Sequence, residues 1–186
     1  LENRVRFPKL VLEKVRAAVG PMFPISFRFS ADEFMEGGNT LEDTLEMMEY
    51  LVDEIDILNV SAAVNDTLQY QIDANYLKDG WRSYMAKAFK EKFNKPVITS
   101  GNIRNPEVAE KILAEGHADL LAMGRGLIAD PEWVNKVRSG REDELRKCIS
   151  CNIGCAGNRI GINRPIRCTV NPSVNEDEAY KKVKEN

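Results

Sequence analysis

A strand–turn–helix–strand–turn pattern between residues 95 and 130 constrains the fold more than any other feature. Residues 96–99 are a short apolar, β-branched run, which is typical of a strand buried on both faces. Residues 106–116 have the apolar spacing of a helix that begins with proline and ends with glycine, and Asn105 is its expected N-cap. Residues 118–123 are a second buried strand. The pattern predicts two parallel strands joined by a helix, as in α/β proteins.

The same alternation of strands and helices runs through the rest of the chain. Apolar periodicity and capping signals predict four more helices and two more strands: helices over 1–19, 40–53, 81–93 and 131–137, and strands over 24–30 and 55–61. The polar loop over 62–80 is unusually long, and such loops are often functional. Four strand–helix units make either half of a (β/α)8 barrel or a complete small doubly wound sheet, and periodicity alone does not separate these two.

The last two predicted strands each end in a glycine turn. Gly101 follows the first strand, and Gly124 and Arg125 follow the second. Glycine lets the backbone approach a ligand closely, and the planar guanidinium of arginine suits phosphate oxygens. In a (β/α)8 barrel, the loops after the seventh and eighth strands often bind phosphate. The two turns therefore predict a phosphate site.

Two further side chains are candidates for a functional role. Arg28 lies on the strand over 24–30, where its charge would either neutralise a bound anion or pair with a neighbouring carboxylate. His117 is the only histidine, and it lies between a helix end and a strand start. That position is at the end of an α/β barrel opposite the catalytic face, so we expect His117 at the surface and not as a general base.

All four cysteines lie between residues 148 and 168, in the order Cys148, Cys151, Cys155 and Cys168. A cluster near one end of the chain is more typical of a metal site in a reducing compartment than of disulfides, so we expect a cytoplasmic protein. Four thiolates at this spacing suit either a [4Fe–4S] cluster or structural zinc. Zinc sites more often show two separated CxxC pairs, and the single pair here favours iron–sulfur.

Charge and hydropathy limit the kinds of partner that we expect. The formal net charge of −3 argues against a general nucleic-acid binder. No apolar run approaches the roughly 20 residues that a membrane span needs, so we expect no membrane insertion. The chain begins with Leu1 rather than methionine, and we expect a processed chain or a fragment of a longer protein.

Together these residues resemble a known family. Four segments are similar to the NADH:flavin oxidoreductases of the Old Yellow Enzyme class. They are LENRVRF at the start, PISFRFS, VITSGNIRNPEVAEKILAEGHADLLAMGRGLIADPEW, and CISCNIGC with the later CTVNP. The resemblance is closer to the iron–sulfur branch of that class. This branch includes 2,4-dienoyl-CoA reductase, enoate reductase, trimethylamine dehydrogenase, bile-acid-inducible oxidoreductases and proteins called NADH oxidase.

The resemblance implies a domain organisation. Residues 1–140 would be the second half, strands five to eight, of an FMN-binding (β/α)8 TIM barrel. Residues 141–175 would be a cysteine-rich iron–sulfur extension, and residues 176–186 a charged tail or linker to a missing flavin domain. Because half a barrel exposes two unpaired strand edges, we expect the isolated chain to self-associate.

The resemblance also implies roles for the candidate residues. Arg28 would contact the pyrimidine edge of FMN, where a cation stabilises the anionic reduced flavin. Four residues correspond to the FMN phosphate loops: Gly101, Asn102, Gly124 and Arg125. The four cysteines correspond to the ligands of a [4Fe–4S] cluster that relays electrons between FMN and a second flavin domain.

The implied activity belongs to a longer parent protein that binds a small-molecule substrate. Electrons would pass from NAD(P)H through FAD, the cluster and FMN to an activated alkene of the enoate, enone or dienoyl type, or to oxygen. The family's catalytic tyrosine lies in the missing half, and residues 60–77 lack the histidine that some relatives carry after strand six. We therefore expect the chain alone to be inactive and assign no catalytic residue. The alternatives are a non-redox phosphate-binding α/β domain with structural zinc, and a module without chemistry of its own.

Overall fold

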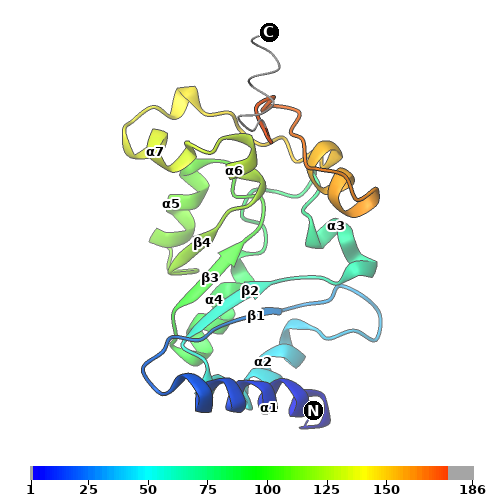
Figure 1. Cartoon of the computed structure of the whole chain (residues 1–186). Coiled ribbons are helices and arrows are strands. Elements are labelled where there is room, and N and C mark those ends of the chain that lie inside the picture. The colour runs from blue at the N-terminus through cyan, green and yellow to red at the C-terminus, as the bar shows by residue number, and fades with distance from the viewer. Residues whose placement is uncertain (1, 176–186) are drawn as a thin grey trace.

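The structure of the chain is a computed structural model. Its central sheet has four parallel strands in the order β1-β2-β3-β4 (Figure 1). The structure describes residues 2–175, so the charged tail predicted over 176–186 lies outside the described residues. The four predicted strands are confirmed with slightly different ends: β1 (Ser26–Ser30), β2 (Ile57–Ser61), β3 (Val97–Ser100) and β4 (Leu120–Ala122). Each strand pairs in parallel with the next one along the chain.

One helix precedes the first strand, and at least one helix follows each strand. Their bounds are α1 (Glu2–Val19), α2 (Leu41–Glu49), α3 (Leu68–Gln71), α4 (Ser83–Phe93), α5 (Pro106–Ala114), α6 (Arg125–Ala129) and α7 (Trp133–Arg138). Short 3₁₀ turns occupy Val52–Glu54, Asn65–Thr67 and Glu142–Glu144, and a π-helix occupies Ile153–Gly161. None of the described helices combines the length and the apolar character that a bilayer crossing requires.

The capping predictions have different outcomes. Thr40 and Asp43 form the predicted capping box, in which Asp43 N–H donates to Thr40 Oγ1 and Thr40 N–H donates to Asp43 Oδ2. Pro106 begins α5 as predicted, and Asn105 is the N-cap residue, although its side chain makes no capping hydrogen bond. The predicted loop over 62–80 is partly helical, since it contains α3 and the turn Asn65–Thr67.

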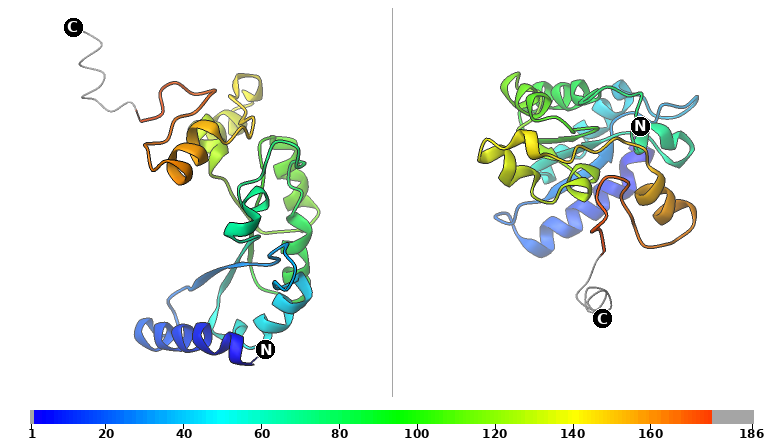
Figure 2. Two further views of the ribbon diagram at one scale, coloured as in Figure 1. Left: turned by 90° about the vertical axis from the view of Figure 1, so that its right-hand side faces the viewer. Right: turned by 90° about the horizontal axis from the view of Figure 1, so that it is seen from above.

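The helices cover one face of the sheet, and this decides between the two predicted architectures. Figure 2 shows α4 and α5 on the same side of the strands. The side chains that point toward the helices are buried: Leu58, Val60, Val97 and Thr99. On the opposite face, the strand register places one residue of each strand side by side, and these side chains are half-buried or exposed: Arg28, Asn59, Ile98 and Leu120. A doubly wound sheet carries helices on both faces, whereas a (β/α)8 barrel carries them only outside, so the chain is half a barrel.

A buried carboxylate at the end of α6 organises the segment that follows this helix. Asp130 is fully buried, and its carboxylate accepts hydrogen bonds from Lys136 Nζ at 2.7 Å and from the N–H groups of Glu132 and Arg146 at 3.1 and 3.0 Å. Burial by itself would raise the pKa of Asp130. The three hydrogen bonds outweigh burial, so the pKa lies below its ordinary value of 3.8.

This lowered pKa predicts a pH dependence of stability. Because the folded pKa is depressed, Asp130 contributes stability at every pH above about 4, and the contribution is lost as the pH falls through the folded pKa. We expect the free energy of unfolding, measured by urea titration, to fall as the pH is lowered below about 4. In Asp130→Asn this fall should be shallower, from a lower starting stability at neutral pH. Equal acid sensitivity in the two proteins would contradict the assignment to Asp130.

Candidate functional site

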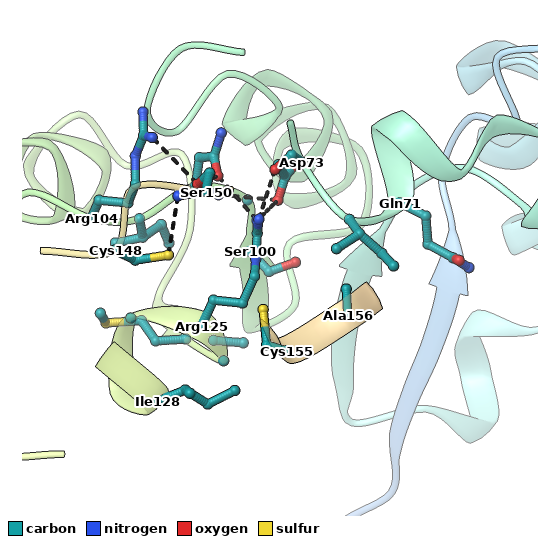
Figure 3. Close-up of a pocket in the computed structure, with 18 of the residues that line it drawn as sticks. Gln71, Asp73, Ser100, Arg104, Arg125, Ile128, Cys148, Ser150, Cys155 and Ala156 are labelled. Carbon is teal, nitrogen blue, oxygen red and sulfur yellow. Dashed lines mark hydrogen bonds and ion pairs between the residues drawn. The ribbon is translucent and has the colours of Figure 1, made fainter. Parts of the chain in front are cut away.

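A cavity of about 490 Å³ lies at the carboxyl ends of the strands. Its walls come from β1, from the segments that follow β2, β3 and β4, and from the cysteine segment (Figure 3). All five residues predicted to bind a cofactor line this one cavity: Arg28, Gly101, Asn102, Gly124 and Arg125. The structure therefore brings together residues that are far apart in the sequence. His117 does not line the cavity, and its Nδ1 lies 3.0 Å from Ser83 Oγ, half-buried rather than on the open surface.

The two glycines serve different purposes. Gly101 has a φ of +125°, and an added Cβ would lie 2.5 Å from Arg82 Nε, so glycine is required by the close packing of Arg82. At Gly124 an added Cβ would meet nothing within 4 Å, which leaves the backbone open to a ligand in the cavity. The predicted turn that begins at Gly124 is wrong in one respect. The short helix α6 starts at Arg125, directly after the glycine.

Arg125 is held by protein groups on several sides. Nη1 donates to the backbone oxygen of Asp73 at 2.7 Å and to Asn152 Oδ1 at 2.6 Å. Nη2 lies 3.1 Å from Asp73 Oδ2 and donates to Asn102 Oδ1 at 3.0 Å. Both terminal nitrogens are thus engaged, and the guanidinium presents a fixed positive charge to the cavity.

Asp73 is the centre of this network, and the sequence reasoning missed it. Its carboxylate accepts hydrogen bonds from Trp81 Nε1 at 2.7 Å and from Asn102 N–H at 3.2 Å, and it pairs with Arg82 and Arg125. The side chains of Asp73 and Arg82 are only 5% and 6% exposed. Burial lowers the pKa of Arg82, and the charge of Asp73 opposes this effect. The available signal was the unusual length of the loop over 62–80, which contains Asp73.

The cavity carries an excess of positive charge. The only carboxylate among the described residues that line it is that of Asp73. Five arginines line the same cavity: Arg28, Arg82, Arg104, Arg125 and Arg159. Arg104 pairs with Asp79 outside the lining, and Arg82 and Arg125 share Asp73. Within residues 2–175, Arg28 and Arg159 form no ion pair; Arg28 donates to Ser61 Oγ at 3.1 Å and Arg159 to Asn163 Oδ1. A cavity with this charge balance suits an anionic ligand.

The four cysteines line a smaller cavity of about 20 Å³ beside the first one. Arg125 lines both cavities, and Figure 3 shows Cys148 and Cys155 close to it. All four side chains are half-buried free thiols, a soft donor set that fits iron–sulfur or zinc. Among the described residues, however, no three Cys, His, Asp or Glu side chains converge closely enough to hold a metal ion. A hydrogen bond with Thr169 Oγ1, 3.3 Å away, lowers the pKa of Cys151.

The one-sided helix cover defines half of a (β/α)8 barrel, and the cavity at its strand ends has a charge that suits an anionic ligand. The sequence profile of the NADH:flavin oxidoreductase / NADH oxidase family matches residues 1–144, so the chain belongs to this family. The predictions of an Old Yellow Enzyme-class oxidoreductase and of half a barrel are confirmed, and the family supports FMN as the flavin.

Individual relatives agree with this assignment. The chain is 50% identical over 185 residues to an NADH oxidase of Thermoanaerobacter brockii, covering 99% of this chain and 28% of that protein. It is 30% identical over 195 residues to a cinnamate reductase of Clostridium sporogenes, covering 97% of this chain and 29% of that protein. A solved complex of 2-naphthoyl-CoA reductase superposes with a TM-score of 0.84 at 30% identity, covering 94% of this chain and 26% of that one. The chain therefore spans less than a third of the length of these relatives.

Proposed function

We propose that this chain forms the FMN-phosphate and cluster-binding part of a longer flavin oxidoreductase. In that protein, electrons pass from NAD(P)H through FAD and a [4Fe–4S] cluster to FMN, and then to an activated alkene or to oxygen. The observation that carries the proposal is that the five predicted flavin residues line one cationic cavity, the four cysteines line the next, and Arg125 borders both. Relatives named NADH oxidase and cinnamate reductase support the two kinds of acceptor.

The residues of the cavity have distinct tasks in this proposal. Bound FMN would supply the two-electron chemistry. Gly124 leaves room for its phosphate, and Arg125 supplies a fixed positive charge there. Arg28 lies on the open face of the sheet, where its charge stabilises the negative charge that develops on a reduced flavin ring. The chain contains no assigned catalytic residue, so we propose that it does not turn over substrate by itself.

We also propose the domain organisation that these roles require. Residues 1–140 hold the flavin side of the site, and residues 141–175 hold the cluster side. Cysteines that ligate a cluster must stay reduced, which supports a cytoplasmic location.

Metal and flavin analysis tests the proposal. After anaerobic reconstitution with iron and sulfide, we expect about four iron and four sulfide per chain and broad absorption near 400 nm. FMN added to this protein should bind with quenching of its fluorescence. A colourless protein that holds one zinc per chain and still binds phosphate compounds would instead support the non-redox alternative. A chain that binds neither metal nor flavin would overturn both functions.

Replacing Arg125 tests the phosphate site directly. We expect Arg125→Ala to weaken FMN binding by about 1.5–3 kcal/mol, the range for hydrogen bonds to charged groups, because the fixed positive charge is lost. Fluorescence titration of FMN measures the change. Arg141→Ala is the matched control, since Arg141 is exposed, does not line the cavity and pairs with Glu144. An unchanged dissociation constant for Arg125→Ala would remove this residue from the site.

A further inference from the structure

The cysteine segment is joined to the phosphate side of the cavity by two side chains that flank Cys151. Ser150 Oγ donates to Asn102 Oδ1 at 2.8 Å, and Asn152 Oδ1 accepts from Arg125 Nη1 at 2.6 Å. Asn152 Nδ2 also donates to the backbone oxygen of Ile72 at 2.9 Å. The two residues next to a predicted cluster ligand are therefore bonded to two of the predicted phosphate-binding residues.

These contacts lie in a buried and conformationally constrained region. Ser150 and Asn102 are only 3% and 5% exposed. Asn102, Ser150 and Asn152 all have left-handed backbone conformations, with φ of 44°, 50° and 59°. Such conformations persist in folded proteins where the surroundings fix them, and here the side-chain hydrogen bonds and the buried Asp73 do so. The turn that carries Cys151 and the turn that carries Asn102 are therefore linked directly through Ser150 and indirectly through Asn152 and Arg125.

We propose that Ser150 and Asn152 are positioning residues that couple occupancy of the cysteine site to flavin binding. Ligation of Cys151 fixes the backbone on both of its sides, which holds Asn152 against Arg125 and Ser150 against Asn102. Arg125 and Asn102 are then already ordered when FMN binds, so part of the entropy lost on ordering these side chains no longer opposes FMN binding. By linkage, bound FMN must strengthen retention of the cluster by the same factor. This inference rests on the proposed function.

The test compares FMN affinity in four proteins, each prepared with the cluster reconstituted and after removal of iron by a chelator. For the unaltered chain we expect the cluster to tighten FMN binding by roughly 5- to 150-fold, the usual range of coupling between two sites. Asn152→Gly keeps the left-handed backbone and removes the amide, so the ratio should fall toward one. Ser150→Ala removes the hydroxyl bond to Asn102 and should also lower the ratio. Asn94→Gly is the matched control, because Asn94 is another left-handed asparagine, exposed at the C-cap of α4 and outside both cavities, and should leave the ratio unchanged.

Iron content is measured for every protein, and iron retention against a competing chelator is measured with and without FMN. Reciprocity predicts that FMN protects the cluster in the unaltered chain and not in Asn152→Gly. If Asn152→Gly fails to hold iron, Ser150→Ala carries the comparison. A chain that binds FMN and iron with no effect of one on the other overturns this inference and leaves the proposed function intact. A chain that binds neither overturns both.

Discussion

Replacing Asp73 with alanine is expected to lower the free energy of unfolding by about 3–5 kcal/mol, the cost of removing one partner from a buried ion pair. The substitution leaves the guanidiniums of Arg82 and Arg125 without their shared carboxylate in a region that water reaches poorly. It also leaves the Trp81 indole N–H without its acceptor. Urea unfolding followed by circular dichroism and tryptophan fluorescence would measure the loss.

Two control substitutions test whether the loss of stability comes from the Asp73 network. Asp66→Ala changes an exposed aspartate of the same long loop and should shift stability by no more than about 0.5 kcal/mol. Asp73→Asn keeps an acceptor for Trp81 and removes only the charge, so its loss should be smaller than that of Asp73→Ala. If Asp73→Ala were as stable as Asp66→Ala, Asp73 would not be the centre of the network.

The isolated chain is expected to associate, with a sedimentation mass at least twice the 21.0 kDa of one chain. Two features of the sheet carry this expectation. Within residues 2–175, β1 and β4 each pair with a strand on one side only, and unpaired strand edges invite pairing with another chain. The face that carries Ile98 and Leu120 also lacks a helical cover among the described residues, and Leu120 is 49% exposed. Association would cover both the edges and this face.

A charge placed on the uncovered face should oppose this association. We expect Leu120→Lys to shift the equilibrium toward a single chain, because Leu120 lies both on the β4 edge and on the open face. Met22→Lys is the matched control, since Met22 is 92% exposed in the turn between α1 and β1 and belongs to no strand. A clean monomer at high concentration for the unaltered chain would contradict the expectation.

The strands and most helices were predictable because their signals are local. The run over 96–99 forms the central strand β3, which its β-branched residues indicated. The expectation that the strands at 96–99 and 118–123 are buried on both faces is wrong for the described chain: in β3 only Val97 and Thr99 are buried, and β4 is half-buried or exposed, because helices cover one face of the sheet. The Thr40–Asp43 capping box depends only on residues three apart, and it forms as predicted. The choice between half a barrel and a doubly wound sheet depends on which face the helices cover, which periodicity does not encode.

The network beneath the cavity was not predictable for the same physical reason. Asp73 meets Arg125 across 52 positions and Asn102 across 29, and no spacing rule links them. The long loop over 62–80 also has the polar residues Asp66, Gln69, Tyr70 and Gln71, and among these four Gln71 lines the main cavity. Arg159 was missed because it lies in the cysteine segment, whose π-helix carries it to the cavity wall. The binding of one [4Fe–4S] cluster by the four thiols stays a prediction.

The arginines around the cavity also act on one another. Burial lowers the pKa of Arg82, and the charge of Asp73 opposes this effect. The charges of Arg28 and Arg125 each lower this pKa further, because like charges repel. An anion in this space is therefore a counter-ion that relieves the repulsion as well as a ligand. Inorganic phosphate or sulfate in a buffer should consequently raise the melting temperature of the chain, and purification in such a buffer would mask the gain expected from FMN.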